Sequence, residues 1–211
     1  MPYPTSDDLR QYLNSASLLS DSTDASVVAG LKLDVCISAA IKNFESDAGR
    51  TMIAVQQTRK FDPPKWGTKV LNLNADLASG SSFTVSIAGS TKTKDTDYYM
   101  IPSTSEYDGN PYAAIEFPVP WTNYSIARKA IQITGYWGFA ADIPNDAYIA
   151  ILAGGAALAV PAIQRAVSQG LIERKEGDTD YKYAENAAKD FMDIYKGGVD
   201  QYVRVASWIG Q

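Results

Sequence analysis

Histidine is absent from this chain of 211 residues, and cysteine occurs once, as Cys36. Without histidine the chain lacks the commonest general base and the commonest metal ligand. A single cysteine can form no internal disulfide, and a zinc site of the Cys/His type is excluded. Cys36 lies in an apolar helical pattern, so we interpret it as a buried structural thiol rather than a reactive one. We therefore expect neither a cofactor nor a metal.

Positive charge is also scarce, because 19 Lys and Arg residues stand against 24 Asp and Glu residues, for a net charge of −5. A mildly acidic surface repels nucleic acid, so specific DNA binding is not expected. No basic group in the sequence is larger than Arg174-Lys175, which is neutralised by its flanking glutamates. The first residues lack the basic and apolar regions of a signal peptide, which predicts synthesis and retention in the cytoplasm.

The hydrophobic pattern changes its period twice along the chain. Apolar residues at three- and four-residue steps predict helices over about 5–13, 24–48, 144–169 and 180–196. Alternating residues and turn clusters predict short antiparallel strands over about 52–137. We expect an α+β fold: a bundle of about four helices with a small inserted antiparallel β-rich region. The prediction is one domain over 1–211, with a C-terminal tail over 197–211.

The last predicted strand, Ile131–Trp137, ends in a corner rich in glycine and aromatic residues. Glycine permits a sharp turn of the backbone, and the aromatic rings bring large apolar area to that turn. A proline suits the first turn of the helix that follows, since its missing N–H costs nothing there. The predicted structural corner comprises Gly135, Tyr136, Trp137, Gly138 and Pro144. A plain strand–helix junction packed by aromatic rings is the alternative.

The helix after this corner carries no charge from Ala147 to Ile163. The stretch is shorter than the ~20 residues of a membrane span, and it consists mostly of alanine and glycine, so we expect no membrane insertion. A helix that is apolar all round is normally buried all round. Its cover is either the chain's own core or a neighbouring copy, and both can hold at once. The residues that would contact a neighbour are Ala150, Gly154, Ala157 and Leu158.

Four stretches together resemble a known family. They are PTSDDLRQYL at 4–13, Ala39-Ala40-Ile41 with Glu45 and Ala48-Gly49-Arg50, the strand over 131–139, and the helix start Ile143-Pro144. In this order, over about residues 4–169, they resemble the head–tail adaptor proteins of tailed bacteriophages, also called connector or head-completion proteins. The most specific element is the Thr-Gly-aromatic-Trp-Gly corner that precedes the Ile-Pro helix start.

The resemblance implies a structural protein of the virion neck, made in the host cytoplasm, and not an enzyme. Such proteins form a homo-oligomeric ring, typically of about twelve subunits, beneath the portal protein. The ring extends the DNA channel and docks the tail or the next neck protein. DNA passes through without specific binding.

Two sets of residues are candidates for these roles. Carboxylates that line the channel would repel phosphate, and the candidates are Asp95, Asp97, Glu106 and Asp108. The alternative for each is a solvated outer loop. The apolar C-terminal stretch suits docking onto the portal, through Tyr202, Trp208 and Ile209. Its alternative is that the stretch folds back on its own domain.

Two other classes of function remain open in the sequence. Aromatic residues in the β-rich region suit a virion module that binds host proteins or glycans, and they are Trp66, Trp121, Tyr98, Tyr99 and Tyr107. Paired carboxylates, Asp95 with Asp97 or Asp7 with Asp8, could serve a hydrolase. Asp7-Asp8 is better explained as the acidic start of a helix, although a standard capping box would place Glu or Gln at position 8. The sequence contains no Gly-rich phosphate loop and no nucleophile elbow.

Overall fold

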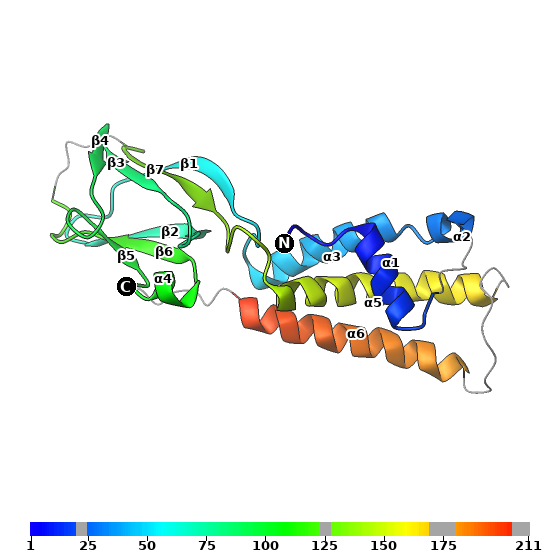
Figure 1. Cartoon of the computed structure of the whole chain (residues 1–211). Helices are drawn as coiled ribbons and strands as arrows, with labels where there is room; N and C mark the ends of the chain where they lie inside the picture. The colour runs from blue at the N-terminus through cyan, green and yellow to red at the C-terminus, as the bar shows by residue number, and fades with distance from the viewer. Residues whose placement is uncertain (20–24, 123–127, 169–179, 204–211) are drawn as a thin grey trace. The chain divides into compact units, whose positions relative to one another are not determined.

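The computed structural model describes residues 1–19, 25–122, 128–168 and 180–203 (Figure 1). Where the sequence predicts one domain, the contacts divide these residues into two compact units. The helical unit comprises Met1–Gly49 and Pro144–Val203, and the β unit comprises Arg50–Ile143. The mixed α+β class is confirmed.

The helical unit contains helices from both ends of the chain. They are α1 (Ser6–Ser15), α2 (Ala25–Gly30), α3 (Leu33–Ala48), α5 (Asn145–Ser168) and α6 (Asp180–Tyr202). The single helix expected over 24–48 is two helices, because Lys32 adopts the left-handed conformation with φ at 51° and interrupts the right-handed path. A bundle of about four helices is therefore not confirmed, since α2 is an additional helix and a further short helix lies in the β unit.

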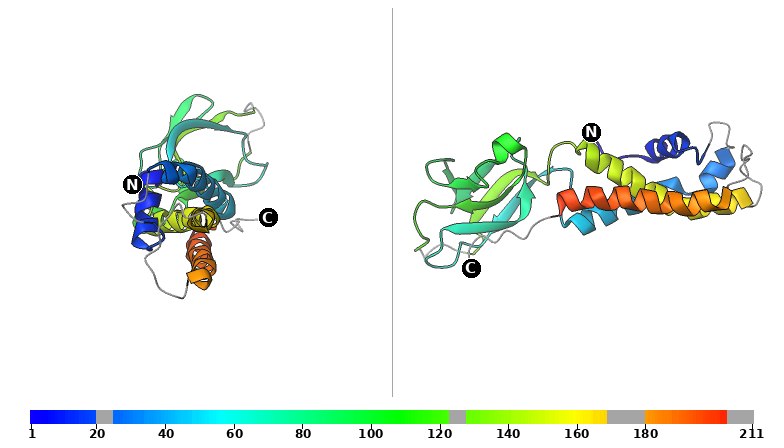
Figure 2. Two further views of the ribbon diagram at one scale, coloured as in Figure 1. Left: turned by 90° about the vertical axis from the view of Figure 1, so that its right-hand side faces the viewer. Right: turned by 90° about the horizontal axis from the view of Figure 1, so that it is seen from below.

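Helix α5 is the central element of the helical unit, and α3 and α6 run alongside it (Figures 1 and 2). Every residue from Ala150 to Ala156 is buried. The covering side chains come from α1, α3 and α6, and they include Leu9, Leu13, Ile37, Phe44, Phe191, Tyr195 and Val199. Most of the uncharged stretch is thus buried by the chain's own helices, whereas Ile149, Leu158 and Pro161 within it are exposed.

The β unit is an antiparallel sheet with one short helix, as the alternation predicts. Its elements are β1 (Val55–Phe61), β2 (Val70–Leu77), β3 (Thr84–Ile87), β4 (Ser90–Lys92), β5 (Tyr99–Ile101), α4 (Ser105–Asp108), β6 (Tyr112–Glu116) and β7 (Ile131–Trp137). The strand order is β4-β3-β7-β2-β6-β5, and β1 also pairs with β7. Strand β7 is central, because it pairs with β1 along its whole length, with β3 over Ile131–Thr134, and with β2 at Trp137.

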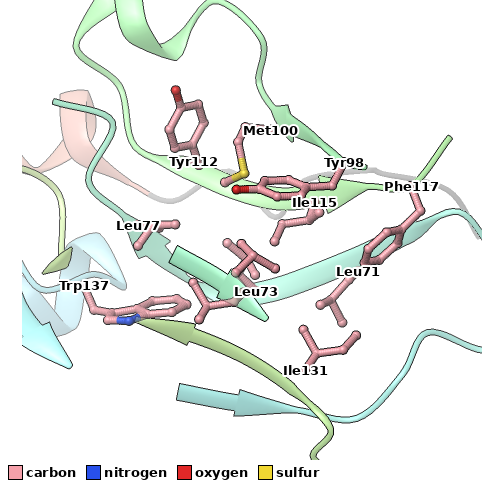
Figure 3. Close-up of a cluster of buried hydrophobic side chains, with 12 residues drawn as sticks. Leu71, Leu73, Leu77, Tyr98, Met100, Tyr112, Ile115, Phe117, Ile131 and Trp137 are labelled. Carbon is pink, nitrogen blue, oxygen red and sulfur yellow. The ribbon is translucent and has the colours of Figure 1, made fainter. Parts of the chain in front are cut away.

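One face of β7 builds the core of the β unit. Ile131, Ile133 and Trp137 alternate with half-buried polar residues and point into the cluster of Figure 3. Tyr98, one of the aromatic residues considered for ligand binding, belongs to this cluster and is only 2 % exposed, so it is part of the core. The β unit therefore has a hydrophobic core of its own, separate from that of the helical unit.

Candidate assembly surfaces

The strand end at Trp137 is a packed structural corner. The indole Nε1 donates a hydrogen bond to the carbonyl oxygen of Gln57 at 3.1 Å, and the guanidinium carbon of Arg59 lies 4.4 Å from the centroid of the ring. Position 135 has no space for a side chain, because a Cβ on Gly135 would lie 2.7 Å from Cβ of Phe83. Large rings and small residues thus interlock on a strand that has no room for a side chain at position 135.

Gly138 makes the turn itself. Its φ is 150°, and a Cβ at this position would lie 2.6 Å from Cα of Ala54. Its N–H donates to the carbonyl oxygen of Asp76 at 2.9 Å. Tyr136 is half-buried and its carbonyl oxygen accepts from Ala78 N–H at 2.9 Å. The corner is therefore held by backbone contacts between strands that are far apart in sequence.

Pro144 lies just before α5 rather than inside its first turn. The helix begins at Asn145, and the carbonyl oxygen of Pro144 accepts the hydrogen bond from Tyr148 N–H at 2.9 Å. Pro144 thus has the position of a residue that flanks the helix and supplies its first acceptor.

A buried ion pair lies beside the corner. Arg50 Nε is 3.5 Å from Asp76 Oδ2, and both side chains are largely buried. The guanidinium of Arg50 also lies over the ring of Phe139, 5.3 Å from its centroid. This pair and the Gly138 turn join the two segments through which the chain enters and leaves the β unit.

Helices α5 and α6 approach each other closely at glycines. A Cβ at Gly198 would lie 2.3 Å from Cβ of Ala150, and a Cβ at Gly154 would lie 2.7 Å from Cδ2 of Tyr195. Small residues let two helix backbones come near and let an aromatic ring fill the space between them. The small-residue surface that the sequence suggested for a neighbouring copy is therefore used by α6 of the same chain.

Two tyrosines of α6 are bonded to carboxylates of other helices. The hydroxyl of Tyr195 donates to Asp47 Oδ2 at 2.8 Å, and that of Tyr202 donates to Asp146 Oδ1 at 2.6 Å. Burial raises the pKa of both phenols well above the ordinary value, and the hydrogen bonds to the carboxylates raise it further. These two bonds fasten α6 to α3 and to α5.

The four residues predicted for subunit contact have different environments. Ala150 and Gly154 are buried beneath α6. Of the two covers considered for the uncharged helix, these residues have the chain's own core rather than a neighbouring copy. Ala157 is half-buried, and Leu158 is 44 % exposed. Of the four residues, only Leu158 and, in part, Ala157 are accessible for contact with another molecule.

The residues predicted for portal docking are only partly described. Tyr202 is buried and bonded to Asp146, which ties it to its own unit rather than leaving it available to the portal. Trp208 and Ile209 lie outside the described residues.

The four predicted channel carboxylates are exposed in the β unit. Asp95 and Asp97 lie between β4 and β5, and Glu106 and Asp108 lie on α4. Glu106 accepts hydrogen bonds from Lys94 Nζ and from the hydroxyl of Tyr112, the latter at 2.8 Å. These bonds, the one from Lys94 first, lower the pKa of Glu106 and thus favour its ionised form, and the positive charge of Lys94 offsets the negative charge of this carboxylate.

The aromatic residues considered for ligand binding divide into two groups. Trp66, Tyr99 and Tyr107 are exposed. Tyr98 is buried, and Trp121 is half-buried against Phe117 with ring centroids 5.4 Å apart. Two of the five aromatic residues therefore serve the internal packing of the β unit.

The paired carboxylates considered for hydrolysis have partners of their own. Asp8 forms a capping box with Thr5, because Thr5 N–H donates to Asp8 Oδ2 at 2.8 Å and Asp8 N–H donates to Thr5 Oγ1 at 3.3 Å. Aspartate thus fills the place where Glu or Gln is standard. The hydrogen bonds from Thr5 lower the pKa of Asp8. Asp97 accepts from Thr93 N–H at 2.8 Å.

A group of basic residues was missed by the sequence reasoning because separate segments contribute to it. The loop between β1 and β2 carries Lys65 and Lys69, β1 carries Lys60, and Arg128 and Lys129 precede β7. The fold joins these segments: Lys129 N–H donates to Asp62 Oδ1 at 2.8 Å, and Lys60 pairs with Gln132 in register. A count of basic residues in sequence windows cannot detect such a group.

Two further features concern metal binding and membranes. The described part of the chain holds no group of three or more His, Cys, Asp or Glu residues placed to bind a metal ion. One helix, over Asn145–Ala166, is long and apolar enough to cross a membrane by length and composition alone. The core helix of a soluble protein passes the same criterion, and most of this segment is buried within the helical unit.

Comparison with known proteins gives similarity of fold. No protein-family model matches the chain, and no curated protein matches it. The chain is similar to a chain of the neck of an empty gene transfer agent (GTA) particle computed with C6 symmetry, at 14 % identity and a TM-score of 0.51, with 100 % of this chain and 96 % of that chain covered.

Two further solved structures are similar to this chain. The neck of a native GTA particle, computed with C12 symmetry, gives 14 % identity, a TM-score of 0.45, and coverage of 95 % of this chain and 93 % of that chain. A chain of the virion of a native gene transfer agent particle gives 13 % identity, a TM-score of 0.45, and coverage of 100 % of this chain and 96 % of that chain. The TM-score of 0.51 alone shows that the chain shares its fold, over its whole length, with a chain found in the neck of the empty GTA particle.

Proposed function

We propose that this chain is a structural subunit of the neck of a phage-like particle. The observation that carries the proposal is the similarity of fold, over 100 % of this chain and 96 % of the other, to a chain of the neck of an empty GTA particle. The resemblance of the sequence motifs to head–tail adaptor proteins points to the same place. The similarity of fold covers the whole chain, and the resemblance of motifs covers about residues 4–169.

In finer detail, the chain is a head–tail adaptor that forms a ring beneath the portal protein. The ring extends the DNA channel and presents its lower face to the tail or to the next neck protein. A ring of about twelve subunits is compatible with the C6 symmetry of the similar neck, since twelve is a multiple of six. The mechanism is assembly and passage of DNA, without bond making.

The distribution of charge suits a channel for DNA. The β unit carries nine basic and eight acidic residues between Arg50 and Ile143, for a net charge of +1. The segments of the helical unit, over 1–49 and 144–203, carry nine basic and sixteen acidic residues, for a net charge of −7. Negative charge at the channel wall keeps phosphates from adhering. We therefore assign the phosphate-repelling surface to the helical unit rather than to Asp95, Asp97, Glu106 and Asp108.

Removal of the protein tests this function. Particles assembled without the chain should have filled heads that lose DNA or lack tails in electron micrographs. Supplying the intact gene in trans is the control and should restore tailed particles. Normal numbers of tailed, DNA-retaining particles without the chain would contradict the proposal.

A second candidate function is a virion module that binds a host protein or a glycan. Exposed Trp66, Tyr99 and Tyr107 favour it, because aromatic rings in loops stack on sugars and pack on proteins. It has less support than the neck role, since Tyr98 and Trp121 are occupied by internal packing. A glycan array probed with the purified chain separates the two: specific binding favours the module, and its absence together with capture of portal protein favours the neck.

A further inference from the structure

Strand β1 forms an edge of the sheet. On one side it pairs with β7, in register from Val55 opposite Trp137 to Phe61 opposite Ile131. The other side of β7 is taken by β3 and β2, so β1 lies outermost, beside β7 alone (Figure 1). Within the described ranges, no strand pairs with the outer side of β1. Since β4 and β5 have three residues each and β1 has seven, β1 is a long edge.

The hydrogen bonds of β7 identify the backbone groups of β1 that face outward. In a strand, the N–H and C=O of one residue point to the same side, and those of the next residue point to the other side. Gly138 N–H donates to Asp76, and the carbonyl oxygen of Tyr136 accepts from Ala78, so even-numbered residues face β2. The odd-numbered residues of β7 therefore face β1, and the register joins them to the odd-numbered residues of β1. The residues of β1 that direct their N–H and C=O away from the sheet are Gln56, Thr58 and Lys60.

These three residues are open to a partner. All of them are exposed. Their outward N–H and C=O groups have no hydrogen-bond partner among the residues that the structure describes. Strand β1 contains no proline and no glycine, and its pairing with β7 has no bulge. Proline and bulges are devices that prevent the addition of a strand to an edge, and β1 has neither.

The charge of this edge is positive. Arg59 and Lys60 lie on β1, and neither β1 nor β7 contains Asp or Glu. Arg128 and Lys129 precede β7, and Asp62, which follows β1, accepts a hydrogen bond from Lys129 N–H. In the strand order, β6 and β5 with their acidic neighbours are separated from β1 by β7 and β2. The edge therefore complements an acidic segment.

The two faces of β1 differ in polarity. Val55 and Phe61 lie on one face, where Val55 is 54 % exposed and the ring of Phe61 packs 5.7 Å from that of Trp137. Lys60 lies on the other face, because successive side chains alternate. A strand added beside β1 distributes its own side chains between the same two faces. Apolar residues that alternate with acidic ones would match both.

We propose that an extended acidic segment of a partner protein adds to β1 as a further strand of the sheet. Its backbone bonds the outward groups of Gln56, Thr58 and Lys60, and its carboxylates pair with Lys60. In this mode of recognition, main-chain hydrogen bonds give affinity and the alternating side chains give specificity. The inference rests on the proposed neck role for one point, namely that the partner is another protein of the neck.

A second copy of this chain is a poorer occupant. Two β1 edges placed side by side would bring the cations of both strands together, which destabilises the pairing. Such a symmetric contact is complete with two copies and builds no ring. The other described edges, β4 and β5, have three residues each, and β4 carries a positive charge of its own at Lys92.

The first test uses a fluorescent peptide of alternating valine and glutamate, as long as β1, and the purified full chain. Fluorescence anisotropy should show binding that weakens at high salt. A peptide of alternating valine and lysine is the control and should not bind. Lys60→Glu should lower the affinity for the glutamate peptide by about fivefold. Failure of the glutamate peptide to bind, or equal binding of both peptides, overturns the inference.

The second test changes the backbone of the edge. Gln56→Pro removes an outward N–H and leaves the bonds to β7 in place, so it should weaken binding of the glutamate peptide by about tenfold. Gln56→Ala is the matched control, because it removes the same side chain and keeps the N–H, and it should bind as the native chain does. Circular dichroism verifies that both variants are folded. Equal binding by the two variants overturns the inference.

Amide hydrogen exchange tests the native chain without any substitution. Nuclear magnetic resonance should show fast exchange at Gln56, Thr58 and Lys60 in the free chain, and slow exchange at Gln57 and Arg59, whose amides face β7. The glutamate peptide should slow exchange at the first three residues. Slow exchange there without the peptide, or exchange that the peptide leaves unchanged, overturns the inference.

Photo-cross-linking in particles identifies the occupant. Thr58→p-benzoyl-phenylalanine should form a link to an acidic, extended segment of another neck protein. A link to a second copy or to DNA overturns the inference. A neck ring whose β1 edges remain unpaired would refute the inference and leave the neck role intact. Binding of the glutamate peptide at β1, with particles that assemble normally without the chain, would support the edge as a docking site and refute the neck role.

Discussion

At the scale of single residues, two adjacent glycines in α6 have opposite surroundings. A Cβ at Gly198 would lie 2.3 Å from Cβ of Ala150, whereas a Cβ at Gly197 would meet nothing within 4 Å. We predict that Gly198→Ala lowers the free energy of unfolding by about 1–3 kcal/mol through overpacking. Gly197→Ala should raise it by about 0.5–1 kcal/mol, because alanine favours the helix. Urea denaturation measures both.

A compensating change makes this prediction specific to the α5–α6 contact. Ala150→Gly added to Gly198→Ala removes the close Cβ pair and should recover part of the lost stability. If Gly197→Ala and Gly198→Ala had the same effect, the close approach of α5 and α6 described above would be incorrect.

The two bonded tyrosines of α6 predict a dependence of stability on alkaline pH. Because the pKa of Tyr195 and of Tyr202 is raised in the folded state, the protonated phenols stabilise the fold. This stabilisation is complete below the unfolded tyrosine pKa of about 10 and is lost as the pH rises above it. Tyr195→Phe with Tyr202→Phe should cost about 1–3 kcal/mol at pH 7 for each bond lost.

The same double variant should lose less additional stability between pH 9 and pH 11 than the native chain does. Thermal melts across this range provide the measurement. The comparison with the native chain is required because burial also raises the pKa of other tyrosines, among them Tyr98 and Tyr112. Parallel pH profiles for the two proteins would contradict the assigned bonds.

At the scale of elements, the corner after β7 depends on a backbone that passes very close to another strand. A Cβ at Gly138 would meet Cα and N of Ala54 at 2.6 and 2.7 Å, and its φ of 150° disfavours any other residue. We predict that Gly138→Ala lowers the free energy of unfolding by more than about 3 kcal/mol or prevents folding of the β unit.

Gly80→Ala is the matched control for the corner. A Cβ at Gly80 meets nothing within 4 Å and its φ is not positive, so the change should be close to neutral. Near-ultraviolet circular dichroism reports the packing of the aromatic cluster in both variants. A folded Gly138→Ala protein with native stability would show that the corner tolerates a side chain.

The elements divide into those that local pattern predicts and those that it does not. The alternation in β7 and the uncharged run of α5 are local signals, and both elements lie where the sequence predicts them. The break at Lys32 depends on one left-handed residue that no periodicity reveals. The cover of α5 depends on contacts between residues such as Ala150 and Gly198, 48 positions apart in the printed sequence.

The candidate surfaces, like the elements, were predicted only where the pattern of neighbouring residues reveals them. Asp95, Asp97, Glu106 and Asp108 were identifiable as exposed carboxylates because turn residues surround them, but the loop predicted for Glu106 and Asp108 is the short helix α4. The basic group of Lys60, Lys65, Lys69, Arg128 and Lys129 was not predicted, since β1, the loop after it and the residues before β7 come together only in the folded sheet. Sequence patterns thus predict elements and exposed turns, whereas surfaces built from several segments need the structure.

At the scale of the whole molecule, charge is divided between the two units, −7 in the segments of the helical unit and +1 in the β unit. In the proposed neck role, the negative charge of the helical unit repels DNA. The fold shared with a chain of the neck of a GTA particle is the main support for that role.

The most direct measurement is a cryo-electron microscopy reconstruction of the neck in particles that contain this chain. The account predicts a closed ring of copies of this fold around the DNA channel, beneath the portal. A neck without any copy of this fold, or copies of the chain located only elsewhere on the particle, would contradict it.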